Sequence, residues 1–369
     1  MKRLLLSTLF IACLLPARAQ TEVTEFRPGL TLEGVNYFLP KTVFEVVVVA
    51  EKAVTRPGEF ADYADRYLRL ANVPKSESTE WTIKSITLLP YGVPDADKAY
   101  SIKLRAKTSA PLVSLTPEGL LLSINTTADP ESVPELPTSV PAPKPVEPRD
   151  YMSHEILSAG STSKMAQLTA EEIYDIRESR NALIRGEADN TPKDGQQLKL
   201  MLDNLDKQLY ALESMFKGET LTSTEVMSFD YEPTSNPEVL GNRQLLCRFS
   251  KRLGLVATDD LAGEPIWITI QPLHSLPVAV ADPETAKKKA KMEQGVYVNQ
   301  PLRTRIVISN AKQTLLTTEV PIAQLGTTEI LSDALFNKQM ETRILFHQHT
   351  GSVKTILGPE PDEDKKGRK

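Results

Sequence analysis

The chain has 369 residues, of which 40% are hydrophobic and 25% charged, with a net charge of -5. This composition is typical of a folded globular protein, and its weakly acidic balance argues against nucleic acid as a partner. The length exceeds what a single core usually accommodates, so we expect two domains. Beyond the N-terminal leader no apolar run is long enough to span a membrane.

Residues 1–19 have the layout of a secretory signal peptide. Lys2 and Arg3 form a basic head, Leu4 to Leu15 an apolar body, and Ala17-Arg18-Ala19 a small-x-small cleavage site before Gln20. The apolar body is too short to anchor the chain in a bilayer. We therefore expect a mature protein that begins near Gln20 and is exported, to the periplasm or to the outer membrane.

Cys13 offers an alternative, because an acylated cysteine at this place would make the protein a lipoprotein. Against this, Phe10 stands where the usual lipoprotein signal has Leu, and cleavage would leave Leu14-Leu15 exposed. Soluble export is favoured. Removal of the leader then leaves Cys247 as the single cysteine, which excludes an internal disulfide. Its alternating, strand-like surroundings predict a buried thiol that behaves as a small hydrophobe.

Residues 20–128 read as an N-terminal β-rich domain with one helix. Val43 to Val49 is a β-branched run that suits a strand covered on both faces. Apolar residues at helical spacing from Glu59 to Ala71 predict an amphipathic helix with an aromatic face against that sheet. Three further short strands are predicted at Trp81–Ile86, Tyr100–Leu104 and Leu120–Ile124.

Residues 129–150 form a Pro-rich linker. Such a segment prefers extended polyproline geometry and cannot bury a core, so it is a semi-rigid spacer or an exposed crossing loop. A ligand for a proline-recognition module is the alternative. The prolines are Pro130, Pro134, Pro137, Pro141, Pro143, Pro145 and Pro148.

Residues 151–220 predict a helical hairpin. Thr169-Ala170-Glu171-Glu172 fits a capping box at the start of the first helix, which runs to Gly186. The second helix ends at Gly218 and carries an apolar seam at alternating spacings of four and three. The seam residues are Leu198, Leu202, Leu205, Leu209, Leu212 and Phe216. Packing within the chain is the favoured use of the seam, and a second subunit is the alternative.

Residues 221–357 predict a C-terminal β-rich domain, a sandwich or an open barrel, with a helical turn near Asp333 to Phe336. Residues 358–369 are a charged tail with the composition of a disordered segment. The fold class is therefore α+β, with two mainly antiparallel β domains joined by the linker and the hairpin. The predicted strands of this domain are Glu225–Tyr231, Leu245–Phe249, Ile266–Ile270, Gly295–Val298, Thr304–Ser309, Leu315–Pro321 and Thr342–Phe346.

His347 and His349 are the candidates for a metal site. Residues two apart on a strand point to the same face, so both imidazoles could meet one ion. A site needs a third ligand, and the sequence identifies none. The pattern therefore favours two polar strand residues at the surface, without a metal or cofactor.

No motif assigns catalytic residues. The pair His154-Glu155 begins like a zinc-protease helix, but Ser158 stands where the second histidine belongs. Nucleophile elbows, phosphate-binding glycine loops and cysteine pairs are absent from the sequence. No sequence rule selects a catalytic pair among the many carboxylates, so a glycosidase-type site is the enzymatic alternative. The basic cluster Lys287–Lys291 favours a solvated turn, with anionic lipid or polysaccharide as the alternative partner.

Four segments resemble the secreted Gram-negative proteins of domain-of-unknown-function family 4831. They are Gly34–Thr42, Pro57–Ala64, Met215–Thr220 and Ala323–Gly326, and the likeness extends over nearly the whole mature chain. The resemblance implies a bacterial envelope protein and supplies no catalytic residues. We therefore expect a non-enzymatic protein that binds or scaffolds an envelope protein or a glycan. A glycan-acting hydrolase is the alternative.

Overall fold

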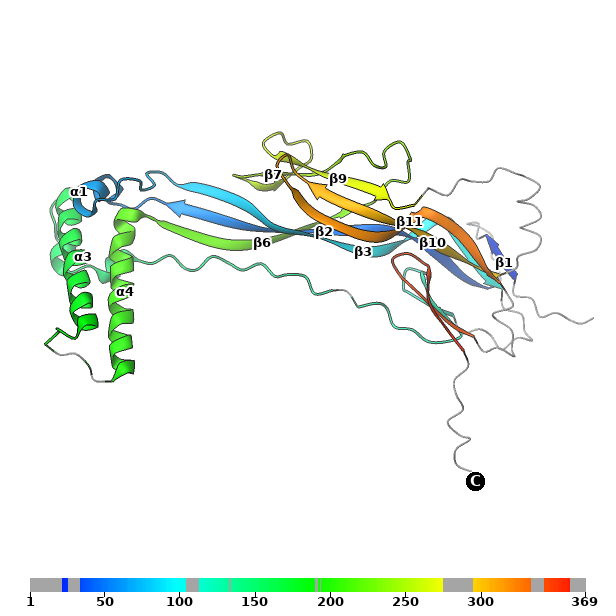
Figure 1. Ribbon diagram of the computed structural model, residues 1–369, viewed down its shortest axis with the longest axis horizontal. Helices are drawn as coiled ribbons and strands as arrows, with labels where there is room; N and C mark the ends of the chain where they lie inside the picture. Colours follow the sequence, from blue (N-terminus) through cyan, green and yellow to red (C-terminus); the bar gives the residue numbers. More distant parts are fainter. Residues whose placement is uncertain are drawn as a thin grey trace, which may run out of the picture.

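The computed structural model describes residues 22–25, 34–103, 113–132, 134–189, 192, 194–274, 295–332 and 342–358. The described chain is elongated, with helices at one end and β-sheets along the rest of its length (Figure 1). The predicted signal peptide, the Lys287–Lys291 cluster, the turn near Asp333 and residues 359–369 lie outside the described residues. No helix in the described ranges is long and apolar enough to cross a membrane.

A long hairpin of β2 (Val35–Arg56) and β3 (Ser78–Lys103) runs along the molecule. Strand β6 (Glu219–Tyr231) pairs with β2 and β1 (Glu22–Glu25) pairs with β3, which gives the antiparallel order β1-β3-β2-β6. Val46, Val47 and Val48 are all buried, which confirms the prediction of a strand covered on both faces. Two runs predicted as separate strands belong to the single strand β3.

A second sheet packs on this hairpin. Its order is β11 (Thr314–Ser332), β10 (Gly295–Ser309), β9 (Glu264–Pro272), β7 (Gln244–Ser250) and β8 (Gly254–Val256). The largest hydrophobic core lies between the two sheets, because apolar residues of both sheets pack into one cluster. Its members include Phe44, Val46, Val48, Ile86, Leu246, Ile268, Ile306 and Ile308.

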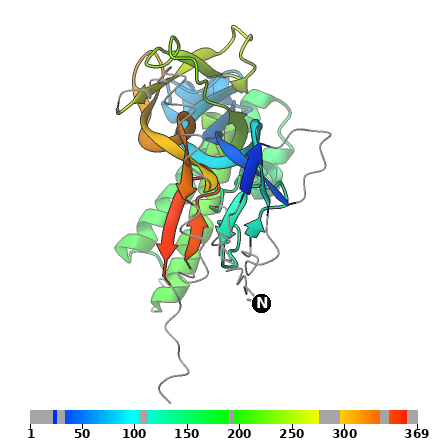
Figure 2. The ribbon, with the colours of Figure 1, turned by 90° about the vertical axis from the view of Figure 1, so that its right-hand side faces the viewer.

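A small third sheet stands at the end opposite the helices, in the order β13 (Val353–Leu357), β12 (Arg343–Phe346), β5 (Leu121–Ile124) and β4 (Val113–Leu115). Figure 2, seen from this end, shows the β12–β13 hairpin beside β4 and β5. Its core joins residues from the first sheet, the second sheet and this one. They include Tyr37, Ile102, Leu121, Val296, Val298 and Ile344.

The fold is β-rich and its sheets are mainly antiparallel, as predicted. The arrangement as two successive β domains is not confirmed. Strand β6 from the C-terminal half lies in the first sheet, and β12 pairs with β5 from the N-terminal half. The physical reason is the long β2–β3 hairpin, whose apolar face has no partner sheet among the described residues of the range 20–128. It is buried by strands that follow the helices, so both halves contribute to shared cores.

The helical end contains α2 (His154–Leu157), α3 (Thr162–Arg185) and α4 (Gly195–Lys217). The predicted capping box at Thr169 is wrong. Helix α3 begins after Ser161, whose side chain accepts a hydrogen bond from the Lys164 N–H, and Thr169 lies inside the helix with its hydroxyl donated to Met165 O. Ser161 provides the earlier cap, and the helix continues through the Thr-Ala-Glu-Glu stretch.

The predicted amphipathic helix is shorter and packs elsewhere. Helix α1 (Ala64–Leu68) follows a 3-10 turn and contacts the helical hairpin instead of the sheet. The Phe60 N–H donates to Met215 O at 2.7 Å, and the Phe60 and Phe216 ring centroids lie 5.4 Å apart. The turn at Pro57-Gly58 places the Phe60 ring against α4, and the C-terminal half of the α4 seam is buried there.

The Pro-rich segment, residues 129–150, crosses the molecule from the third sheet to the helices (Figure 1). It touches β6 midway, where Val140 and Thr224 exchange backbone hydrogen bonds of 2.8 and 2.9 Å. Ser139 Oγ accepts a further bond from the Val226 N–H. Prolines lack an N–H donor, so the segment covers part of the β6 edge without a continuous ladder.

Candidate functional site

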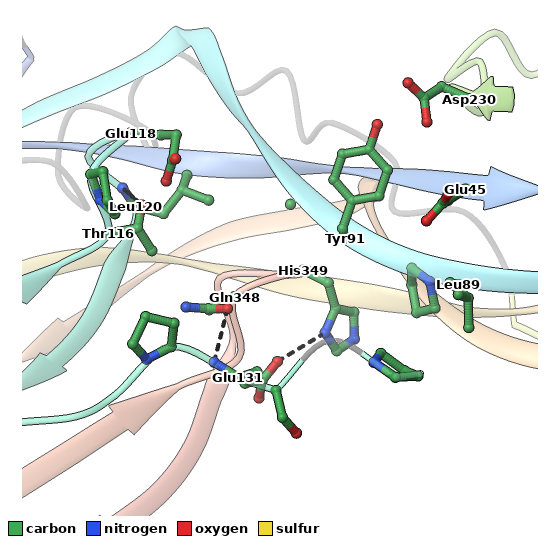
Figure 3. Close-up of a pocket in the computed structure, with 16 residues that line it drawn as sticks. Glu45, Leu89, Tyr91, Thr116, Glu118, Leu120, Glu131, Asp230, Gln348 and His349 are labelled. Atoms are coloured by element: carbon green, nitrogen blue, oxygen red, sulfur yellow. Dashed lines mark hydrogen bonds and ion pairs between the residues drawn. The ribbon is translucent and has the colours of Figure 1, made fainter. Parts of the chain in front are cut away.

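A cleft of about 540 Å³ opens where the first sheet, the third sheet and the start of the Pro-rich segment meet (Figure 3). We call it the acidic cleft, because four carboxylates line it and no Lys or Arg is among the described residues of its lining. Its carboxylates are Glu45, Glu118, Glu131 and Asp230. The remaining lining residues are Leu89, Pro90, Tyr91, Gly92, Thr116, Pro117, Leu120, Pro130, Ser132, Pro134, Gln348 and His349.

Tyr91 of β3 stands in the middle of this cleft. Glu118 lies on one side of its ring, and Glu45 and Asp230 lie on the other (Figure 3). Partial burial, the hydrogen bond to Asp230, and the charges of Asp230 and Glu45 raise the pKa of Tyr91 to about 12. The phenol is therefore neutral at physiological pH. Proline and leucine side chains supply apolar surface around it.

One wall of the cleft is the β12–β13 turn (His347–Ser352). Two backbone bonds close it: the His347 N–H donates to Ser352 O at 2.9 Å, and the Gly351 N–H donates to His347 O at 2.7 Å. Gly351 has a φ of +70°, and a Cβ there would lie 2.5 Å from Cδ of Pro40. Glycine is therefore required both by the backbone conformation and by the close approach of β2.

Thr42 on β2 also holds the turn in place. The Thr42 hydroxyl is buried, donates to His349 O at 2.8 Å and accepts from the Ala323 N–H at 3.0 Å. A Cβ on Gly92 of β3 would collide with the backbone carbonyl of Gln348. Contacts with β2 and β3 thus hold the turn in one position, and β11 holds the Thr42 hydroxyl that binds it.

Glu131, near the start of the Pro-rich segment, faces this turn. Its N–H donates to Gln348 Oε1 at 3.1 Å, so the Gln348 side chain sets the position of the Glu131 backbone. The Glu131 carboxylate reaches Nδ1 of His347 at 3.3 Å and Nδ1 of His349 at 3.7 Å. Lys354 of β13 contacts the same carboxylate at 3.0 Å. Among the described residues, Glu131, His347 and His349 bring one potential metal-ligand atom each within 4.8 Å of the others.

The environment sets the protonation of two members of this group. Burial raises the pKa of Glu131, but the hydrogen bonds and charges of Lys354 and His347 outweigh it and the net shift is downward. Burial lowers the pKa of His349, and the nearby Glu131 charge opposes this only in part. At neutral pH the site therefore contains a carboxylate and a neutral imidazole at position 349.

The structure changes the interpretation of the two histidines. They do not share the face of a strand, since β12 ends at Phe346 and both lie in the turn. They nevertheless turn toward the same carboxylate, with ring centroids 5.5 Å apart. Glu131 was missed because it is one of several acidic residues in a segment interpreted as a linker, and no sequence signal relates it to residues 216 positions away.

Other predicted sites stay apart from the cleft. Cys247 is buried in the core between the sheets, and burial raises the pKa of its thiol to about 12. That environment matches the predicted hydrophobic role. His154 lies in the short helix α2 at the helical end, far along the molecule from the β12–β13 turn (Figure 1).

The model of one protein family, described as a domain of unknown function (DUF4831), matches residues 33–354. The chain belongs to the DUF4831 family. The match includes the second sheet, the helices, the acidic cleft, and the first and third sheets except for β1 and the end of β13. No curated protein and no solved structure matches the chain.

Proposed function

We propose that this DUF4831 protein is an exported, non-enzymatic binding protein of the bacterial envelope. Its acidic cleft receives a cationic segment of a partner protein. The observation that carries the proposal is the charge of the cleft: four carboxylates line about 540 Å³, and the described lining includes no Lys or Arg. Lys354 already pairs with Glu131, which leaves Glu45, Glu118 and Asp230 for a ligand. A partner that brings Lys or Arg side chains would neutralise them.

The surroundings of the carboxylates support recognition of a peptide. The Tyr91 ring offers a π face for a cationic side chain, and the prolines and leucines of the lining offer apolar contacts. The β12–β13 turn and Glu131 are held by hydrogen bonds that exist without a ligand. A prearranged wall reduces the entropy lost on binding. The elongated shape, with a helical hairpin far from the cleft, suits a protein that connects two partners (Figure 1).

Binding of labelled oligo-arginine, oligo-glutamate and neutral oligosaccharide probes to the mature protein tests this function. The variant Glu45→Gln/Asp230→Asn should weaken oligo-arginine binding by about tenfold or more, and added salt should weaken it further. The matched control Glu238→Gln/Asp259→Asn changes two exposed carboxylates outside the cleft lining and should bind as the unmodified protein does. Equal binding by both variants would refute the proposal.

A glycan-acting hydrolase is the second candidate, because a cleft with several carboxylates and an aromatic ring also suits a sugar. Glu131 is a poor general acid, since its pKa is lowered instead of raised. A catalytic pair would therefore come from Glu45, Glu118 and Asp230. Release of reducing sugar from envelope or dietary glycans, abolished by Glu118→Gln or Asp230→Asn, would favour the hydrolase over the binding protein.

Export is the remaining part of the proposal and rests on the leader sequence. Cell fractionation should place the protein in the periplasm or with the outer membrane. A Cys13→Ser variant separates the two forms of the proposal, because a lipoprotein loses its acyl chain and a soluble protein is unaffected. Recovery of the full chain in the cytoplasm would contradict export.

A further inference from the structure

Glu131, His347 and His349 form a group at the wall of the acidic cleft, and the binding of a cationic segment assigns no role to the two imidazoles. Two imidazoles and one carboxylate are the donor set of a borderline divalent ion such as Zn²⁺. In a tetrahedral site with bonds of about 2.0–2.2 Å, the donor atoms stand about 3.3–3.6 Å apart. Glu131 Oε1 lies 3.3 Å from Nδ1 of His347, and Glu131 Oε2 lies 3.7 Å from Nδ1 of His349. One ligand atom of each of the three residues lies within 4.8 Å of the others, so small side-chain rotations would bring the set to this geometry.

We propose that Glu131, His347 and His349 form a divalent transition-metal site that joins the Pro-rich segment to the β12–β13 turn. All three side chains are half-buried, so an ion can reach them from solvent and still displace part of their hydration. Three protein ligands leave a fourth position for water. Glu131 and His349 also line the acidic cleft, so this position is close to the cleft wall.

The ligands are held by structure that surrounds them. His349 is fixed through its carbonyl by Thr42, His347 through its backbone bonds to Ser352 and Gly351, and Glu131 through Gln348. The three residues of the His-Gln-His sequence thus have two distinct roles: the outer two supply imidazoles, and the middle one positions the third ligand. A preorganised set of ligands binds an ion without the cost of ordering the chain.

Lys354 is the feature that opposes a cation. Its ammonium contacts Glu131 Oε1 at 3.0 Å and is partly exposed. A bound ion would compete with this ammonium for the carboxylate, and Lys354 would turn outward to solvent. Removal of the lysine charge should therefore strengthen metal binding, by about fivefold for one charge at this distance in a solvated site.

The test is calorimetric titration of the tag-free mature protein with Zn²⁺, together with the visible absorption of Co²⁺ bound in its place. We expect one site per chain and a tetrahedral Co²⁺ spectrum. His347→Ala/His349→Ala should abolish both signals, and Glu131→Gln should weaken binding by more than about tenfold. The matched control is His154→Ala/His274→Ala, which removes the other two of the four histidines and should bind normally.

Lys354→Met is the control for misfolded variants. It is expected to raise the affinity for Zn²⁺, and loss of structure cannot produce that gain. Tighter Zn²⁺ binding by Lys354→Met, with loss in the site variants and normal folding by circular dichroism, supports the site. Equal Zn²⁺ binding by the two double-histidine variants would overturn it. So would unchanged affinity in Glu131→Gln, or a Lys354→Met protein that binds no ion, since the group would then be an ion-pair network without a metal.

Discussion

The Glu131 carboxylate lies 3.3 Å from Nδ1 of His347, although 216 residues separate the two along the chain. This contact ties the first part of the Pro-rich segment to the β12–β13 turn. The segment is consequently part of the candidate site and more than a connection between folded parts.

Gln348→Ala should loosen the start of the Pro-rich segment. The variant removes the acceptor of the Glu131 N–H bond, a loss of about 1 kcal/mol, while the backbone of the turn is unchanged. We expect faster limited proteolysis near Ser132 and weaker metal binding. Gln167→Ala, which removes an exposed side-chain bond on α3, serves as the control. Cleavage at the same rate in both variants would argue against the positioning role of Gln348.

Gly351→Ala should destabilise the protein more than Gly186→Ala. Both glycines have nearly the same φ, +70° and +72°, so each substitution incurs a backbone cost of about 1–2 kcal/mol. A Cβ at position 351 also lies 2.5 Å from Cδ of Pro40, whereas nothing lies within 4 Å of one at position 186. The difference between the two variants in urea unfolding isolates this contact. Equal destabilisation by the two substitutions would mean that Pro40 of β2 moves away from the added Cβ at no cost in free energy.

Glu213→Gln should weaken the helical hairpin at neutral pH. Glu213 of α4 is nearly buried and pairs with Arg177 of α3 and with Lys217. Loss of its charge should lower stability by about 1–2 kcal/mol. Asp206→Asn, which breaks a more exposed pair with Arg180, should lower stability less than Glu213→Gln does. Urea unfolding followed by the helical far-UV signal measures both.

The Glu213 contribution should also depend on pH. Burial raises the pKa of Glu213, but Lys217 and Arg177 outweigh it and leave the folded-state pKa below the ordinary value of 4.5. Stability from this group is therefore present above that value and is lost as the pH falls through the lowered pKa. The gap between the unmodified protein and Glu213→Gln should close in acid. A gap that persists at strongly acidic pH would point to packing in place of charge.

Cys247 should resist thiol reagents in the native protein. Its side chain is buried and its pKa is raised to about 12, so almost no thiolate forms at mildly alkaline pH. We expect no labelling of a mature chain that lacks Cys13 until denaturant is added, and then one label per chain. Rapid labelling of the folded protein would show that the sheets open to expose the thiol.

The sequence predicted those elements whose signal is local. The apolar run in β2 and the spacing of Leu205, Leu209, Leu212 and Phe216 each fix an element because burial requires that period. Element boundaries were less secure: an alternative cap at Ser161 started α3 before Thr169, and one β3 strand replaced two predicted ones. These differences arise where neighbouring residues continue a helix or strand past a local signal.

The candidate site shows the same division. Sequence alone identified His347 and His349 as candidate metal ligands, from their type and their spacing. Tertiary structure supplied Glu131, the acidic cleft and the clamp of Thr42 on the turn, because each depends on segments that meet only after the β2–β3 hairpin has paired with strands from both halves. Periodicity reports which face of an element is buried, but not which distant element buries it. The sequence therefore determined the elements and the tertiary packing decided the site.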